Sequence, residues 1–204
     1  MKYRYRILHT ETPYQGFLRL NRYHLRHDLF AGGESRPLMR ERVEMFQAVS
    51  VLPYDPLLDQ VVLIEQFRIG AMEHPGGAWV LEVVGGIIEA GESPRQVAHR
   101  ETLEEAGCEL LALEPICDFM VSPGTSTERI HLFCGRVDAS KAGGIHGVGA
   151  EGEDIRVEVL DFAAAMAELY HGRINSTSSI IAMQWLALNR QGLRRDWLGE
   201  APGG

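Results

Sequence analysis

The chain has 204 residues, of which 45% are hydrophobic and 24% are charged, proportions typical of a folded globular protein. Its formal net charge of −8, with no basic stripe, excludes nucleic acid as an expected partner. The opening stretch MKYRYRILHTE has no apolar signal core and no run reaches the length of a membrane span, so no membrane partner is expected. The three cysteines lack metal-ligand spacing, which favours a reducing, cytoplasmic location.

The first 47 residues have the period-two alternation of β-strands. Apolar Tyr3, Tyr5 and Ile7 alternate with basic residues, and a turn is expected around Pro13 before a second strand. Three short strands bury little surface by themselves. We therefore expect residues 1–47 to form a small antiparallel β domain that packs against something else, such as a second subunit.

From Ala48 onwards, strongly apolar runs predict a second domain that spans residues 48–204. Strands are expected in AVSVLPYDP, QVVLIEQFR and WVLEVVGG and at residues 114–121, 129–137 and 155–160. Helices are expected at residues 94–106, 162–171 and about 178–190, whereas the glycine-rich stretch KAGGIHGVGAEGED is expected to form no regular element. Strands and helices mixed without strict alternation indicate an α+β sandwich.

The first predicted helix has clear end signals. Ser93 is a suitable N-cap, Pro94 suits the first helical position, and Gln96 completes a capping box with Ser93. Gly107 stands where a left-handed residue would end the helix.

The same helix carries more acid than a structural helix needs. With Arg100, the side chains of Glu101, Glu104 and Glu105 lie within one arc of roughly 140°. Carboxylates at this spacing repel one another by roughly 0.2–0.5 kcal/mol per pair, and the helix dipole disfavours negative charge near a C-terminus. A solvated acidic face would explain the charge but neither its spacing nor the glycines at both ends. A bound cation explains a cluster that is so unfavourable by itself, and oxygen-only ligands favour Mg²⁺ or Mn²⁺.

The spacing resembles the Nudix box. The matching positions are Gly86, Glu92, Arg100, Glu101, Glu104, Glu105 and Gly107. The resemblance implies the Nudix fold, an α/β/α sandwich with a mixed sheet, and metal ligation by Glu101, Glu105 and the backbone carbonyl of Gly85. It places Glu104 beside these ligands in the catalytic group, and Arg100 is expected to hold a neighbouring carboxylate in place.

The glycine-rich stretch ends in acidic residues, among them Glu151 and Glu153. An acidic surface loop is the alternative that composition alone favours. Metal-assisted hydrolysis, however, needs a group that deprotonates water, and a mobile acidic loop could deliver one when substrate binds.

Outside the box, the chain resembles the bacterial ADP-ribose pyrophosphatase family over nearly its whole length. The matching stretches are YQGFLRL, VVLIEQFRIG, WVLEVVGG, SPGTSTE, GIHGVGAEGEDIRV and SIIAMQWLAL. This resemblance implies that Glu151 is the general base and Glu153 a further metal ligand. The chain departs from the family at AMEHPGGA, so contacts near residues 71–78 stay open.

Four further residues match substrate-binding positions of that family. The resemblance implies that Arg40 and Arg68 bind the substrate, that Glu128 lies near its terminal ribose, and that Phe17 lies beside its adenine. Each has an ordinary alternative: a surface ion pair for each arginine, a solvated turn for Glu128, and a strand core position for Phe17.

Together with the predicted cation site, the resemblance implies an Mg²⁺-dependent hydrolase that cleaves ADP-ribose to AMP and ribose 5-phosphate. One alternative is a pyrophosphatase for another nucleoside-diphosphate sugar, such as GDP-mannose. A second is a Nudix-like module that senses nucleotide without cleaving it, which would predict erosion of the metal-binding glutamates, and here they are all present. The resemblance also implies a homodimer with exchanged N-terminal strands.

Overall fold

The computed structural model describes residues 3–199, apart from the side chain of Glu151. The chain divides into two compact units. One unit runs up to Gln47 and includes Met120–Arg129, and the other comprises Ala48–Phe119 and the chain from Ile130 onwards. Residues 120–129 thus belong with the N-terminal strands, although their position in the sequence suggested the second domain.

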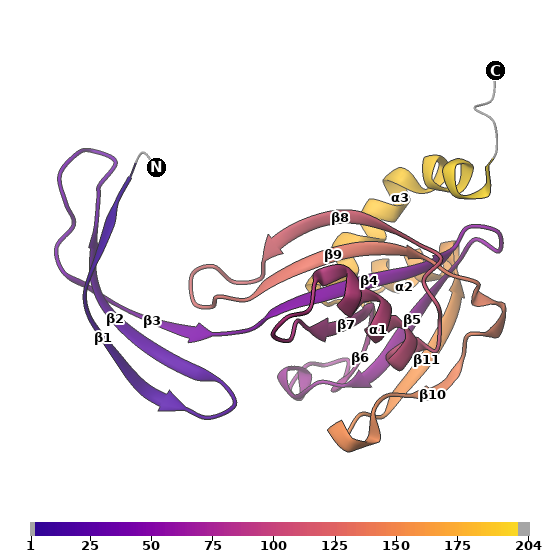
Figure 1. Cartoon of the computed structure of the whole chain (residues 1–204), viewed down its shortest axis with the longest axis horizontal. Coiled ribbons are helices and arrows are strands. Elements are labelled where there is room, and N and C mark those ends of the chain that lie inside the picture. Colours follow the sequence, from indigo (N-terminus) through magenta and orange to yellow (C-terminus); the bar gives the residue numbers. More distant parts are fainter. Residues whose placement is uncertain (1–2, 200–204) are drawn as a thin grey trace. The chain divides into compact units, whose positions relative to one another are not determined.

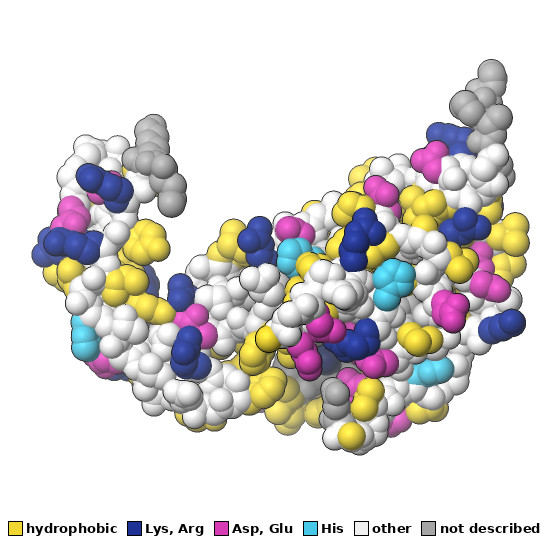
Figure 2. Space-filling view, in the orientation of Figure 1, with side chains coloured by type: hydrophobic (Ala, Val, Ile, Leu, Met, Phe, Trp, Pro, Cys, Tyr) yellow, Lys and Arg dark blue, Asp and Glu magenta, His cyan; other side chains and the backbone are white. Residues whose placement is uncertain are grey.

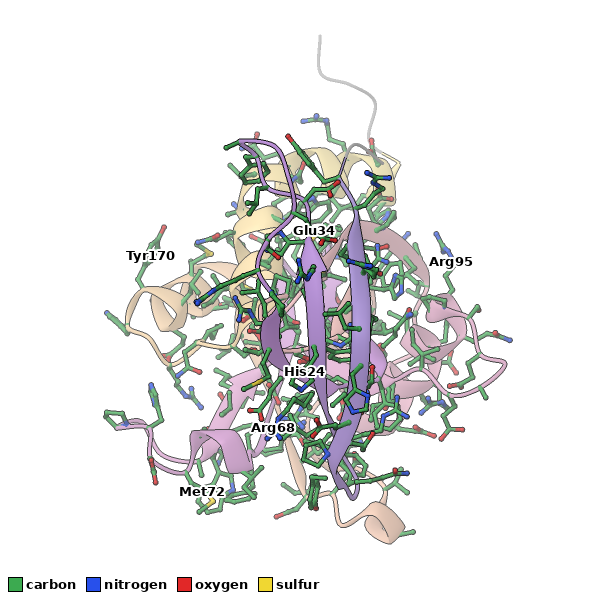
Figure 3. All side chains as sticks on the ribbon, turned by 90° about the vertical axis from the view of Figure 1, so that its left-hand side faces the viewer. His24, Glu34, Arg68, Met72, Arg95 and Tyr170 are labelled. Atoms are coloured by element: carbon green, nitrogen blue, oxygen red, sulfur yellow. The ribbon has the colours of Figure 1, made fainter. Side chains whose placement is uncertain are left out.

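The first unit is built on a three-stranded antiparallel sheet in the order β1-β2-β3 (Figure 1). Its strands are β1 (Tyr5–Gln15), β2 (Arg19–His27) and β3 (Leu38–Glu44). Figure 3 shows this sheet face-on, with His24 on β2 and Glu34 in the loop that leads to β3. The predicted small antiparallel β domain is therefore present as a sheet.

The turn predicted around Pro13 was wrong, because β1 continues through it. The register between β1 and β2 shifts between Glu11 and Tyr14, and the chain reverses only after Gln15. β1 is an edge strand, and an edge strand tolerates the missing N–H of proline because its outer side has no partner strand.

Segment 120–129 joins the first unit through backbone contacts with the end of β3. The N–H of Val43 donates to the carbonyl of Thr125 at 2.8 Å, and that of Thr127 donates to the carbonyl of Val43 at 3.1 Å. The N–H of Met45 also donates to the Thr127 hydroxyl at 2.8 Å. These bonds pair backbone groups at the end of β3 with residues about 80 positions later in the chain, a contact that the sequence pattern does not reveal.

The second unit contains an eight-stranded sheet in the order β10-β11-β5-β4-β9-β8, with β6 paired to β5 and β7 paired to β4. Its strands are β4 (Gln47–Asp55), β5 (Gln60–Phe67), β6 (Trp79–Glu82), β7 (Val84–Ile87), β8 (Ala112–Met120), β9 (Arg129–Arg136), β10 (Gly144–His146) and β11 (Ile155–Asp161). β5 runs antiparallel to β4, β6 and β11. β9 runs parallel to β4, because the N–H of Val137 donates to the carbonyl of Tyr54 where both strands end. The predicted mixed sheet is confirmed.

Helices cover both faces of this sheet (Figure 1). They are α1 (Pro94–Ala106), α2 (Phe162–Tyr170) and α3 (Thr177–Leu198), with short 3₁₀ turns η1 (Ile69–Ala71), η2 (Ala139–Lys141) and η3 (Gly149–Glu151). Alternate side chains of β5 enter separate cores: Ile64 packs with Val97 of α1, whereas Leu63 packs with Met183 of α3. Because strand side chains alternate between faces, two cores on one strand establish the predicted α/β/α sandwich.

Two expectations within this unit were wrong. The run WVLEVVGG forms two strands, because the chain changes partner from β5 to β4 at Val83, whose N–H donates to the buried Ser179 hydroxyl at 3.0 Å. The glycine-rich stretch is partly regular, because residues 144–146 add β10 to the edge of the sheet beside β11. Glycines with positive φ, among them Gly143 and Gly147, flank this short strand.

The last helix extends beyond the predicted end, to Leu198, and its residue Leu188 is 87% exposed. No helix in residues 3–199 is both long and apolar enough to cross a membrane. The three cysteines are free.

Candidate active site

Helix α1 begins and ends at the predicted residues. The Ser93 hydroxyl accepts the N–H of Gln96 at 3.4 Å, and Gln96 Oε1 accepts the N–H of Ser93 at 2.9 Å, so the capping box forms. Gly107 ends the helix with a φ of 63°. On this helix, Val97 is fully buried, whereas Leu103 is 53% exposed.

One guanidinium braces three carboxylates at this helix. Arg100 donates from Nε and Nη2 to the two oxygens of Glu92, at 3.0 and 3.1 Å. Its Nη1 donates to Glu101 at 2.7 Å and to Glu104 at 3.2 Å. Figure 2 shows acidic and basic side chains gathered over α1. Hydrogen bonds from Arg100 lower the pKa of Glu92, which therefore serves as the fixed anion that orients the arginine.

Glu101 packs directly over strand β7. A Cβ added at Gly86 would lie 1.7 Å from Glu101 Oε1, so only glycine leaves room for this carboxylate. Burial raises the pKa of Glu101, and the charge of Arg100 opposes that rise. The glycine of the sequence pattern is thus explained by close approach.

Glu105 is the most buried acid of the cluster, with 2% exposure. Its Oε2 accepts the N–H of Gly85 at 2.9 Å. Burial raises the pKa of Glu105 to about 8, although the Gly85 N–H favours the ionised form. A carboxylate in such a place is stabilised as an anion by a nearby positive charge, and a divalent cation would supply one.

The glycine-rich loop that carries Glu151 and Glu153 contacts α1 through its backbone. The N–H of Gly147 donates to the carbonyl of Glu104 at 3.2 Å, and Glu153 Oε2 accepts the N–H of Val148 at 2.8 Å. A Cβ at Gly147 would lie 2.7 Å from the Cβ of Glu153. The backbone of Glu151, the predicted base, ends η3, while its side chain lies outside the described part of the structure.

The donor set fits a hard divalent cation by its chemistry, because Glu101, Glu105 and Glu153 offer only oxygen atoms. Burial is the main cause of the raised pKa of Glu101 and Glu105, and the charge of nearby Glu153 adds to it. Among the described residues, no three His, Cys, Asp or Glu side chains are arranged so that they could hold a metal ion. Arg100 instead contacts the oxygens of Glu101 and Glu104. Ligation by the Gly85 carbonyl stays a prediction.

Arg68 and Glu82 form an ion pair, of which only the arginine was predicted as a site residue. Arg68 follows β5, and Met72 lies on the loop beyond it (Figure 3). Arg68 Nε donates to Glu82 Oε1 at 2.6 Å, so the ion-pair alternative for this arginine is observed. Glu82 is 9% exposed and was not predicted as a site residue. The sequence does hold a signal for Glu82, because it is the single acid within the apolar run WVLEVVGG. Burying an acid in such a run costs free energy unless the acid is paired.

Three predicted substrate residues lie in the first unit. Phe17 occupies the turn between β1 and β2, is 79% exposed, and has its ring centroid 5.9 Å from that of Phe46, so the strand-core alternative was wrong. Arg40 lies on β3 and donates to the carbonyl of Met39 at 2.8 Å, with no ion pair to any residue in the described range. Glu128 is half-buried in segment 120–129.

A set of glutamates that offers only oxygen donors on one helix is chemically suited to a divalent cation, which can assist hydrolysis. A family model described as "NUDIX domain" matches residues 45–179. The chain therefore belongs to the Nudix family.

Several relatives match most of the chain. It is 45% identical over 191 residues to the ADP-ribose pyrophosphatase of Escherichia coli strain K12, covering 94% of this chain and 91% of the relative. Identity to the ADP-ribose pyrophosphatase of Haemophilus influenzae is 43% over 194 residues, covering 94% and 89%. Identity to the GDP-mannose pyrophosphatase of Cronobacter sakazakii is 33% over 152 residues, covering 73% and 78%.

The fold also resembles a solved structure described as an ADP compounds hydrolase. The TM-score is 0.71, and the alignment covers 93% of this chain and 95% of the other. The sequences are 20% identical, so this likeness supports the Nudix fold alone.

Proposed function

We propose that this protein is an Mg²⁺-dependent enzyme, with Mn²⁺ as a substitute, that hydrolyses ADP-ribose to AMP and ribose 5-phosphate. The observation that carries the proposal is the 45% identity to an ADP-ribose pyrophosphatase over 94% of the chain. The three glutamates of α1 and the acidic loop supply the chemistry that such a reaction needs.

In this proposal, Glu101, Glu105, Glu153 and the carbonyl of Gly85 would hold the cation, which when bound would neutralise negative charge on the pyrophosphate. Arg100 holds the side chains of Glu101 and Glu104 in place through its hydrogen bonds. The Gly85 N–H donates to Glu105 and holds its side chain against β7, and this bond favours the ionised form that a metal ligand needs.

Proton transfer is assigned to the glycine-rich loop. Glu151 accepts a proton from the attacking water. Glu104 is assigned to the same group of catalytic residues as Glu151. The bond from Gly147 to Glu104 holds the loop against α1, and the bond from Val148 to Glu153 closes the loop on itself. Both limit the positions that Glu151 can reach. Arg68 and Arg40 bind the diphosphate side of the substrate, Phe17 the adenine and Glu128 the terminal ribose.

We also propose a cytoplasmic homodimer in which the N-terminal strands of one copy complete the site of its partner. The first unit supports this, because it leaves large apolar side chains uncovered: Tyr5, Phe17 and Phe30 are 71%, 79% and 92% exposed. Exposed apolar surface of this kind marks interaction sites, and a two-fold dimer would cover it on both copies.

The test is a panel of nucleoside-diphosphate sugars assayed with Mg²⁺, with products separated by chromatography. We expect the highest kcat/KM for ADP-ribose, with AMP and ribose 5-phosphate as products. A preference for GDP-mannose would favour the second candidate, which the similarity to a GDP-mannose pyrophosphatase supports. Tight binding without turnover of any member would identify a nucleotide sensor.

A further inference from the structure

The ion pair between Arg68 and Glu82 has an unusual placement on the sheet. The N–H of Arg68 donates to the carbonyl of Ala78, so these two residues face each other across the hairpin of β5 and β6. Arg68 Nε nevertheless reaches Glu82, four residues past Ala78 in sequence, at 2.6 Å. The arginine side chain therefore lies back along the sheet instead of extending from the end of its strand.

Glu82 draws the guanidinium towards the acidic helix. Its cross-strand partner is Ile64, which packs in the core beneath α1, so Glu82 lies on the face of the sheet that α1 covers. Burial raises the pKa of Glu105, and the charge of Arg68 is among the influences that oppose this rise. Arg68 is therefore held near the helix glutamates while its side chain keeps 47% exposure.

Only one nitrogen of the Arg68 guanidinium, Nε, takes part in the contact with Glu82. Within the described structure, the hydrogen bonds and ion pairs of the Arg68 side chain all run through Nε to Glu82. Nη1 and Nη2 remain available, and an arginine edge with two parallel donors matches two oxygens of a phosphate group.

From this geometry, we propose that Glu82 is a positioning residue: it fixes Arg68 so that Nη1 and Nη2 face the diphosphate of a nucleoside-diphosphate sugar. The substrate class rests on the proposed function, whereas the positioning rests on the Arg68–Glu82 contact. The competing explanation is that this contact only stabilises the hairpin.

Glu65 provides a matched control. It is another ion-paired glutamate of the same hairpin, with side-chain exposure of 15% against 12% for Glu82. Its partners are Arg156 and Arg173, so Glu65→Gln removes a comparable charge without touching Arg68. Glu82→Gln keeps the shape of the side chain and removes its charge, which avoids leaving a cavity.

The experiment compares steady-state kinetics with ADP-ribose for the wild type, Glu82→Gln, Arg68→Lys and Glu65→Gln, each checked for folding by its thermal midpoint. We expect Glu82→Gln and Arg68→Lys to raise KM about tenfold with little change in kcat, because uniform binding is lost. Glu65→Gln should leave KM unchanged. In an Arg68→Ala background, Glu82→Gln should add less than about twofold, because its effect passes through Arg68.

An unchanged KM in Glu82→Gln, or a full tenfold rise that persists in the Arg68→Ala background, would overturn the inference. A measurement without substrate tests the positioning role of Glu82 independently of the proposed function. The Arg68 Nε–H proton should exchange with water at least about tenfold faster in Glu82→Gln than in the wild type or Glu65→Gln. A wild type that does not hydrolyse ADP-ribose would refute the proposed function, while equal exchange rates would refute the positioning role.

Discussion

At the scale of single residues, the site depends on carboxylates held where water solvates them poorly. Glu105 is the extreme case, because it is buried against strand β7 with one backbone N–H as its hydrogen-bond donor. An anion there is unfavourable until a cation arrives, so the same burial that destabilises the metal-free protein favours metal binding.

This predicts a pH dependence of stability in the metal-free protein. The folded pKa of Glu105 is about 8, above its unfolded value, so the folded state binds more protons between these two values. The free energy of unfolding should therefore fall as pH rises from ~5 to ~8, by roughly 3–5 kcal/mol if Glu105 acts alone. Urea unfolding in a chelator at both pH values measures this fall. Glu105→Gln should flatten it, and an equal fall in both proteins would show that another group is responsible.

Glu151 has a separate expected effect. A base on the loop acts in the transition state, so Glu151→Gln should lower kcat by roughly 100-fold or more while KM changes little. The comparison is Glu153→Gln, which should weaken metal affinity as well, as judged by the Mg²⁺ concentration for half-maximal rate. If Glu153→Gln lowered kcat more than Glu151→Gln with metal affinity unchanged, the two roles would be exchanged.

At the scale of elements, strand β7 and helix α1 must approach closely for the site to form. Gly86→Ala should displace the Glu101 carboxylate, because the new Cβ would lie 1.7 Å from Glu101 Oε1. Activity should fall by at least roughly 100-fold, as when a key electrostatic group is lost. Gly192→Ala in α3 is the matched control, since its nearest neighbour would be 3.9 Å away, and it should keep activity and add about 0.5–1 kcal/mol of stability. Full activity in Gly86→Ala would contradict the close-approach explanation.

The elements also show what the sequence can and cannot reveal. Helix α1 was predicted to the residue, because Ser93, Gln96 and Gly107 are local signals that bind their own backbone. The apolar strands of the second domain were predicted, but the break at Val83 was missed because it depends on Ser179, far away in the sequence. Glu82 was missed for the same reason, since its partner Arg68 becomes adjacent only when β5 and β6 pair. Short-range sequence patterns therefore predict helices and strands, whereas contacts between distant strands can be identified only once the fold is known.

At the scale of the whole molecule, the proposed dimer places residues from two copies in one site. Arg40→Ala and Glu105→Gln should each be inactive alone, because each removes one half of every site. Refolded together, the two variants should regain about a quarter of wild-type activity, since mixed dimers contain one site with neither substitution. Mixtures that stay inactive, although they form mixed dimers, would contradict exchange of the N-terminal strands.

The central claim is that the glutamates of α1 catalyse hydrolysis of ADP-ribose. The most direct test is the rate of AMP formation from ADP-ribose with Mg²⁺, measured for the wild type and for Glu105→Gln. We predict turnover in the wild type and a loss of at least roughly 100-fold in Glu105→Gln, with the fold intact because the side-chain shape is kept. Near-normal turnover in a folded Glu105→Gln protein, or no AMP from the wild type, would contradict the claim.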